Sequence, residues 1–135
     1  MYLFDTDALS QIIRRNPSIS FIKKLAFVPP HQQFTTAITV GEMVYGAHKS
    51  NRPAHFISRL NYLVWPNIQI LPFDKDSAEI YGKIRAELEK KGTPLTEPDM
   101  RIASIALCHK LALVTGNVKH FSKISGLTIE NWLKT

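Results

Sequence analysis

Acidic and amide side chains stand at the ends of apolar segments, a placement that suits the binding of a hard metal ion. The chain has only 11 carboxylate side chains, so their positions are informative. Asp5 closes the apolar run that begins at Tyr2, and Glu42 stands near the start of a predicted helix. Asp99 belongs to the first turn of another helix, and Asn117 directly follows a further apolar run. Three carboxylates in one cleft repel one another and raise one another's pKa, and a bound divalent cation offsets this repulsion. A ligand set made only of oxygens selects a hard ion such as Mg²⁺ or Mn²⁺.

Each of these acids, taken alone, also has an interpretation as part of a helix cap. Thr39 to Glu42 has the spacing of a capping box, and Thr96 to Asp99 nearly repeats it. Asp7 is placed to be the N-cap of the first helix. Asp5 has no obvious capping role in the sequence. The joint placement of the acids therefore carries the argument for a site, and no single residue does.

The elements that must position these side chains alternate between strands and helices. We expect strands at 2–5, 34–38, 68–73, 111–115 and 127–132. We expect helices at 7–15, from 17 to before 29, and at 40–49, 53–64, 75–91, 98–110 and 118–122. This alternation predicts one α/β domain over residues 1–135, a three-layer α/β/α sandwich with a mostly parallel central sheet. The carboxyl ends of its strands would share one edge, where such folds place their sites.

Composition narrows the class of protein. The chain has 135 residues, of which 44% are hydrophobic and 21% charged, with a mean hydropathy of −0.09, so it is not predominantly disordered. The single cysteine, Cys108, excludes an intramolecular disulfide and a cysteine-based zinc cluster. No apolar run has the length of a membrane span, and the N-terminus lacks the basic region of a signal peptide. We expect a cytoplasmic protein.

The net charge indicates a polyanionic partner. Lys and Arg number 17 against 11 Asp and Glu, giving a formal charge of +6. The candidate phosphate contacts are Arg14, Arg15, Lys23, Lys24, Lys49, Arg52, Arg59, Lys119, His120 and Lys123. Lys119 and His120 are favoured because they lie next to Asn117, although scattered basic residues are also typical of a solvated surface. Arg85 has two open roles, a substrate contact or a surface ion pair.

Four ordered segments of the chain resemble the PIN-domain family. They are Tyr2 to Asp7, Thr36 to Gly46, Leu95 to Ala106 and Leu113 to Phe121. Together with the C-terminal Gly126 to Leu133 segment, the resemblance covers essentially the whole chain. Within this family the sequence is most similar to the VapC-type toxins of toxin–antitoxin pairs.

The resemblance implies an endoribonuclease that depends on Mg²⁺ or Mn²⁺. The family's acids map onto Asp5, Glu42 and Asp99, which would be both catalytic residues and metal ligands. Many members carry a fourth acid where this chain has Asn117, and since Asn supplies no charge the number of metals stays open. The resemblance also implies RNA as substrate, a cognate antitoxin protein as partner and a homodimer.

Further residues are assigned to the predicted site by their position. Hydrogen-bonding side chains beside the acids would support it: Thr6, Thr115 and Asn117. Basic side chains would contact the RNA: Lys119, His120 and Arg85.

Two other functions remain open in the sequence. Asp5-Thr6-Asp7 after an apolar strand resembles the nucleophile motif of haloacid-dehalogenase-type phosphatases, but Leu9 replaces the expected Thr or Val and no later paired-acid segment appears. A degenerate PIN domain that binds RNA or a partner without cleavage is the non-enzymatic alternative, motivated by Asn117. The sequence lacks a serine-nucleophile elbow, a P-loop and a dinucleotide-binding fingerprint.

Overall fold

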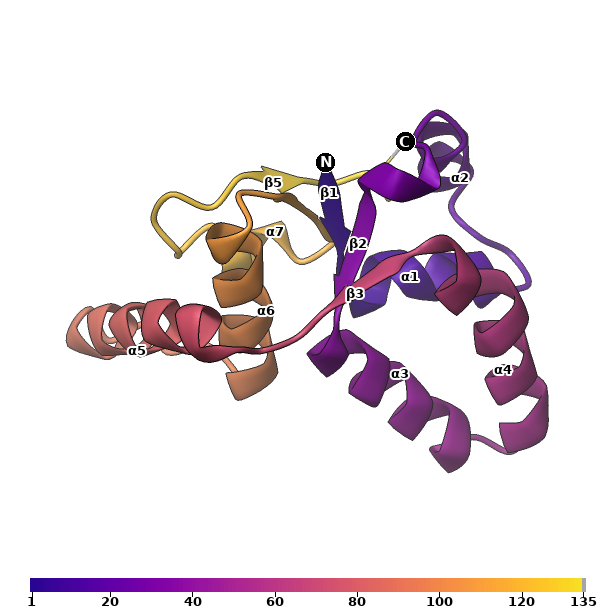
Figure 1. Cartoon of the computed structure of the whole chain (residues 1–135), viewed down its shortest axis with the longest axis horizontal. Helices are drawn as coiled ribbons and strands as arrows, with labels where there is room; N and C mark the ends of the chain where they lie inside the picture. The colour runs from indigo at the N-terminus through magenta and orange to yellow at the C-terminus, as the bar shows by residue number, and fades with distance from the viewer. Residues whose placement is uncertain (135) are drawn as a thin grey trace.

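A parallel five-stranded sheet forms the centre of the computed structural model, which describes residues 1–134 (Figure 1). Thr135, the last residue of the predicted domain, lies outside the described residues. The strands are β1 (Tyr2–Phe4), β2 (Gln33–Thr36), β3 (Gln69–Leu71), β4 (Ala112–Val114) and β5 (Ile129–Glu130). They lie in the order β3-β2-β1-β4-β5, and every pairing between neighbours is parallel. The predicted parallel sheet is confirmed, with the N-terminal strand at its centre.

Helices cover both faces of the sheet. They are α1 (Thr6–Ile13), α2 (Ile19–Leu25), α3 (Ala37–Lys49), α4 (Pro53–Arg59), α5 (Lys75–Lys90), α6 (Glu97–Cys108) and α7 (Val118–Phe121), with short helical turns at Pro30–Gln32, Leu60–Val64 and Trp65–Asn67. In Figure 1, α5 and α6 lie on one side of the strands, while α1, α3 and α4 lie on the other. The three-layer α/β/α sandwich expected from the sequence is therefore confirmed.

The alternation of side chains along the central strands builds one core on each face. Successive residues of a strand point to opposite faces of a sheet. Leu3 and Leu113 are fully buried in the core that contains the apolar residues of α5 and α6. Phe4 and Val114, the next residues along, are fully buried in the core formed with α1, α2 and α3. Both faces of the sheet are covered by apolar side chains, so the polar residues that could form a functional site lie at the ends of β1 and β4.

The boundary between β2 and α3 differs from the sequence expectation. The strand ends at Thr36 and the helix begins at Ala37, because the Thr36 hydroxyl accepts a hydrogen bond from Thr39 N at 3.0 Å and so caps the helix. The predicted capping box from Thr39 to Glu42 is therefore wrong. Both threonines have the chemistry of an N-cap, and only the tertiary position of β2 selects the first.

None of the helices in residues 1–134 is long and apolar enough to cross a membrane.

Candidate active site

Asp5 leaves the central strand and begins α1. Its backbone N donates to Val114 O at 3.2 Å, which holds it beside the end of β4. Its Oδ1 accepts a hydrogen bond from Ala8 N at 3.0 Å, so Asp5 is the N-cap of α1. The sequence interpretation, which gave that cap to Asp7 and no capping role to Asp5, is wrong on both points. Only 5% of Asp5 is exposed, and one carboxylate oxygen is fixed by the cap.

The electrostatic state of Asp5 shows that other carboxylates are close. Burial raises its pKa to about 7, against lowering contributions from hydrogen bonds of the Thr115 hydroxyl and Ala8 N. The negative charges of Asp7 and Asp99 contribute to this raised pKa. Both acids therefore act electrostatically on Asp5, and the joint role of Asp5 and Asp99 in one site stays a prediction.

Asp99 reaches this place from the first turn of α6. Its backbone N donates to the Thr96 hydroxyl at 3.3 Å, so the cap predicted at Thr96 is confirmed. The side chain is half-buried, and burial raises its pKa. Hydrogen bonding from Thr96 and the charge of His120 lower that pKa, while Asp7 raises it. His120 therefore lies near the carboxylates, as its position after β4 suggested.

Asp7 is a further acid near Asp5 and Asp99 that the sequence analysis did not assign to the site. It lies exposed in the first turn of α1 and acts electrostatically on both Asp5 and Asp99. Its Oδ2 is only 3.8 Å from the point where a Cβ on Gly116 would stand, so it faces the loop that follows β4. The available signal is the Asp-x-Asp spacing within Tyr2 to Asp7, which is typical of a helix cap and of a phosphatase motif as well as of the PIN-domain segment.

Glu42 stands at the margin of this group. Thr6 Oγ1 donates to Glu42 Oε1 at 2.8 Å, which ties the start of α1 to α3. Glu42 is not among the charges that shift the pKa of Asp5 or Asp99. Within residues 1–134, no three His, Cys, Asp or Glu side chains are gathered closely enough to hold a metal ion by themselves. Asp99 thus acts on Asp5 through its charge, whereas Glu42 contacts Thr6.

The loop after β4 supplies the remaining polar groups. Buried Thr115 hydrogen-bonds Asp5 through its hydroxyl, and the same oxygen accepts from Asn117 N at 2.9 Å. The Asn117 amide nitrogen and His120 Nδ1 lie 2.8 Å apart. Lys119 is exposed next to them. This loop therefore fixes Thr115 under Asp5 and holds the His120 ring by its Nδ1.

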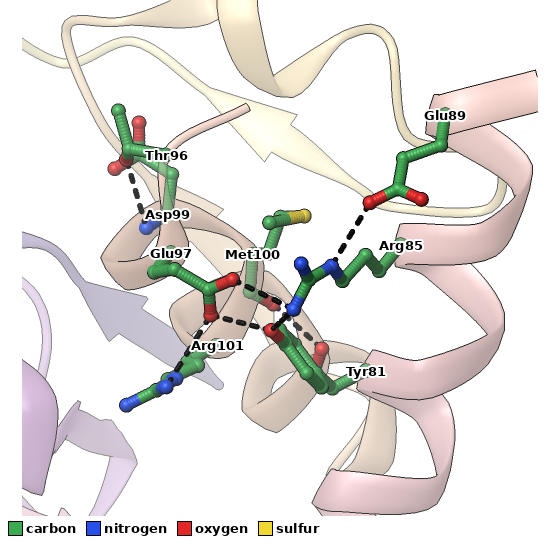
Figure 2. A network of polar contacts seen from close by, with 9 residues as sticks. Tyr81, Arg85, Glu89, Thr96, Glu97, Asp99, Met100 and Arg101 are labelled. Atoms are coloured by element: carbon green, nitrogen blue, oxygen red, sulfur yellow. Dashed lines mark hydrogen bonds and ion pairs between the residues drawn. The ribbon is translucent and has the colours of Figure 1, made fainter. Parts of the chain in front are cut away.

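Arg85, predicted as an RNA contact or a surface pair, lies in an ion-pair network between α5 and α6 (Figure 2). Its Nε lies 3.0 Å from Glu89 Oε1, and its Nη1 lies 3.0 Å from Glu97 Oε1. Glu97 also accepts a hydrogen bond from Tyr81 and pairs with Arg101 at 3.3 Å. The network holds Arg85 in surface pairs and turns Glu97 toward α5.

The donor groups at the sheet edge fit a hard divalent cation. No Lys or Arg in residues 1–134 forms an ion pair with Asp5, Asp7 or Asp99. A buried carboxylate without a cation is costly, as the raised pKa of Asp5 reflects. Mg²⁺ keeps several waters and is usually bound through one or two carboxylates, so it does not require a closed protein cage. The carboxylate oxygens of Asp5, Asp7 and Asp99 are of the kind that Mg²⁺ binds in such open sites.

Comparison with known proteins gives consistent matches along the chain. A family model described as the PIN domain matches residues 2–127. "Ribonuclease VapC2" from Rickettsia felis is 31% identical over 99% of this chain and 99% of its own. The "tRNA(fMet)-specific endonuclease VapC" of Salmonella typhimurium is 31% identical over 97% of each chain. A crystal structure of VapBC2 from Rickettsia felis bound to a promoter DNA fragment matches with a TM-score of 0.89 at 30% identity, over 97% of this chain and 98% of that one.

Proposed function

The chain belongs to the PIN-domain family, and from that premise we propose that it is a metal-dependent endoribonuclease, the toxin of a toxin–antitoxin pair. The observation that carries the proposal is that the charges of Asp7 and Asp99 act on the buried Asp5 at the carboxyl edge of the sheet, while no Lys or Arg in residues 1–134 pairs with any of the three acids. The match to VapC ribonucleases supports the same conclusion, whereas the phosphatase alternative has no such support.

These three carboxylates, with Glu42 at the margin through Thr6, are the groups that would hold Mg²⁺ or Mn²⁺. When bound, the ion supplies Lewis acidity that lowers the pKa of a water and offsets charge on the phosphate. The residues of the chain orient the groups of the site. Asp5 is fixed by Ala8 N and the Thr115 hydroxyl, so one of its oxygens keeps a constant direction.

Asp99 is suited to orient the attacking water. It is half-buried, and its raised pKa makes it a better proton acceptor than an ordinary aspartate. His120, whose Nδ1 lies 2.8 Å from the Asn117 amide nitrogen, would contact a substrate phosphate through Nε2. Water attack on phosphorus with loss of the 3′ oxygen would leave 5′-phosphate and 3′-hydroxyl ends.

The partners follow from the family. The cognate antitoxin would cover the site, and the toxin would pair as a homodimer. Because one relative is named as a tRNA(fMet)-specific endonuclease, tRNA(fMet) is the first defined substrate to try.

The test is incubation of the protein with total cellular RNA and Mn²⁺, with and without chelator, followed by mapping of the cut ends. We expect cleavage that the chelator stops and that Asp5→Asn abolishes. Asp76→Asn, the same change at an exposed position in the first turn of α5, is the matched control and should cleave normally. Full activity of the Asp5→Asn protein would contradict the assignment.

A second readout does not depend on turnover. Mn²⁺ at about 100 times its Kd should stabilise the protein by about 2.7 kcal/mol, seen as a higher Tm, because the ion binds the folded state. Asp5→Asn should lose most of that increase. The degenerate-domain alternative, motivated by Asn117, instead predicts RNA binding without cleavage at millimolar Mg²⁺ or Mn²⁺.

A further inference from the structure

The arginines of the chain divide into two groups. Two of them, Arg85 and Arg101, form ion pairs in the network between α5 and α6 (Figure 2). The remaining four line a single cavity between the end of α1 and α4: Arg14, Arg15, Arg52 and Arg59. Both helices lie on the opposite side of the sheet from α5 (Figure 1).

Positive charge in this arginine pocket is not balanced by acids. Within residues 1–134, none of its four arginines forms an ion pair with a carboxylate. The cavity has a volume of about 610 Å³, and its other lining residues are Ser10, Ile13, His55 and Phe56. Loss of hydration and the charges of Arg52 and Arg59 lower the pKa of His55. The pocket is thus a concentrated positive site with open space in it.

A second cavity adjoins the arginine pocket. It has a volume of about 360 Å³, shares the lining residues Ser10, Ile13 and Phe56, and extends to Thr6 and Glu42. At 1.5 Å per residue, α1 separates its two ends by about 10 Å. The arginine pocket is therefore about one short helix away from Thr6, the residue that follows Asp5.

We propose that the arginine pocket binds a backbone phosphate of the RNA, away from the phosphate that is cleaved. This inference rests on the proposed function, since it extends the same substrate. Arginine presents a planar fork of donors that matches phosphate oxygens, and basic grooves follow nucleic-acid backbones. Arg59 is already oriented, because its Nε donates to Ile13 O at 3.2 Å and its Nη groups remain for a ligand.

RNA is favoured over an acidic peptide by the position of the pocket. It adjoins the cavity that reaches Thr6 and Glu42, so an RNA strand that extends from the proposed site along α1 would bring a further phosphate to the arginines. A remote contact of this kind would set the register of the strand at Asp5. The adjoining cavity is lined by the apolar residues Met43 and Ala47, so the arginines are the main polar groups at that end.

The test measures binding of a single-stranded RNA oligonucleotide in the Asp5→Asn background, which keeps the RNA intact. Arg15→Gln with Arg52→Gln removes two exposed charges from the pocket without touching a core. Lys83→Gln with Lys90→Gln removes the same charge from exposed positions of α5 and is the matched control. We expect the pocket variant to weaken RNA binding about tenfold and to reduce the salt slope by about two, with little change in the control.

Equal affinities in the two charge-matched variants would overturn the proposal, while chelator-sensitive cleavage by the otherwise unchanged chain would still support the proposed function. A second arm uses an oligoglutamate peptide of matched charge. If the pocket variant loses binding of this peptide but keeps that of RNA, the pocket is a site for an acidic segment and the phosphate assignment is wrong. Loss of RNA affinity by the pocket variant alone supports the phosphate site, even if the chain cleaves no RNA.

Discussion

Glu97 and Asp99 lie two residues apart in the same turn of α6, yet their surroundings give them opposite roles. Glu97 accepts a hydrogen bond from Tyr81, which lowers its pKa, and it pairs with Arg85 and Arg101 (Figure 2). Asp99 faces the sheet edge, where burial raises its pKa and Asp7 adds to the effect. The comparison shows that the absence of arginine, not the presence of an acid, distinguishes the candidate site from a structural ion pair.

The largest expected effect tests this division directly. Asp99→Asn should lower RNA cleavage by about 10²-fold or more, because this is the usual contribution of a general base that accepts a proton from the attacking water. Glu97→Gln should keep cleavage near the original level, because Glu97 faces α5. Single-turnover cleavage rates at saturating Mn²⁺ provide the measurement. Equal losses in the two variants would remove the distinction.

The second prediction concerns stability against pH in the absence of metal. The pKa of Asp5 is about 7 in the folded protein and 3.8 as the reference value, so the folded state binds its proton more tightly. Stability from this group is therefore fully present below about pH 4 and declines as pH rises to about 7, by up to about 1.4 kcal/mol per pH unit. Urea unfolding at several pH values gives the free energy of unfolding as a function of pH. The Asp5→Asn variant should show a smaller decrease of this free energy with pH, since Asn keeps the helix cap without the charge.

A smaller effect is expected at Asp7, which is exposed. Asp7→Asn should lower cleavage about tenfold and raise the Mn²⁺ concentration needed, because one of the three charges around the ion is lost. Asp76→Asn, in the equivalent turn of α5, is the control. Measurement of the cleavage rate at increasing Mn²⁺ concentrations separates weaker metal binding from a folding defect. If the variant needs no more Mn²⁺ than the original protein, Asp7 lies outside the site.

The smallest effect belongs to the ion-pair network itself. Glu97→Gln should lower Tm only slightly, because the pairs with Arg85 and Arg101 are exposed and solvent screens them. The lowered pKa of Glu97 means that its contribution is present at neutral pH and is lost as the acid becomes protonated. Thermal unfolding at neutral and acidic pH measures this, and a large drop in Tm would show that the network supports α6 as a whole.

The sequence predicted the layers and the parallel sheet because strand and helix patterns alternate clearly, and strand ends in such a sheet share an edge. It therefore predicted that Asp5 and Asp99 share an edge, and the charge of Asp99 does act on Asp5, while their joint role in a site stays a prediction. It did not predict the position of Glu42, because the hydrogen bond with Thr6 depends on how α1 packs on α3. Asp7 was missed because a first-turn aspartate is equally typical of a cap. The direction of Arg85 was open because it depends on where α6 lies beside α5.

The central position of β1 has a consequence for biosynthesis. β1 is translated before one of its two neighbours, β4, which spans Ala112–Val114. Asp5 consequently has no completed surroundings until β4 has also left the ribosome. A chain whose synthesis stops before α6 would lack both the Asp99 and the Thr115 side chains, so it would not become harmful to the cell that makes it.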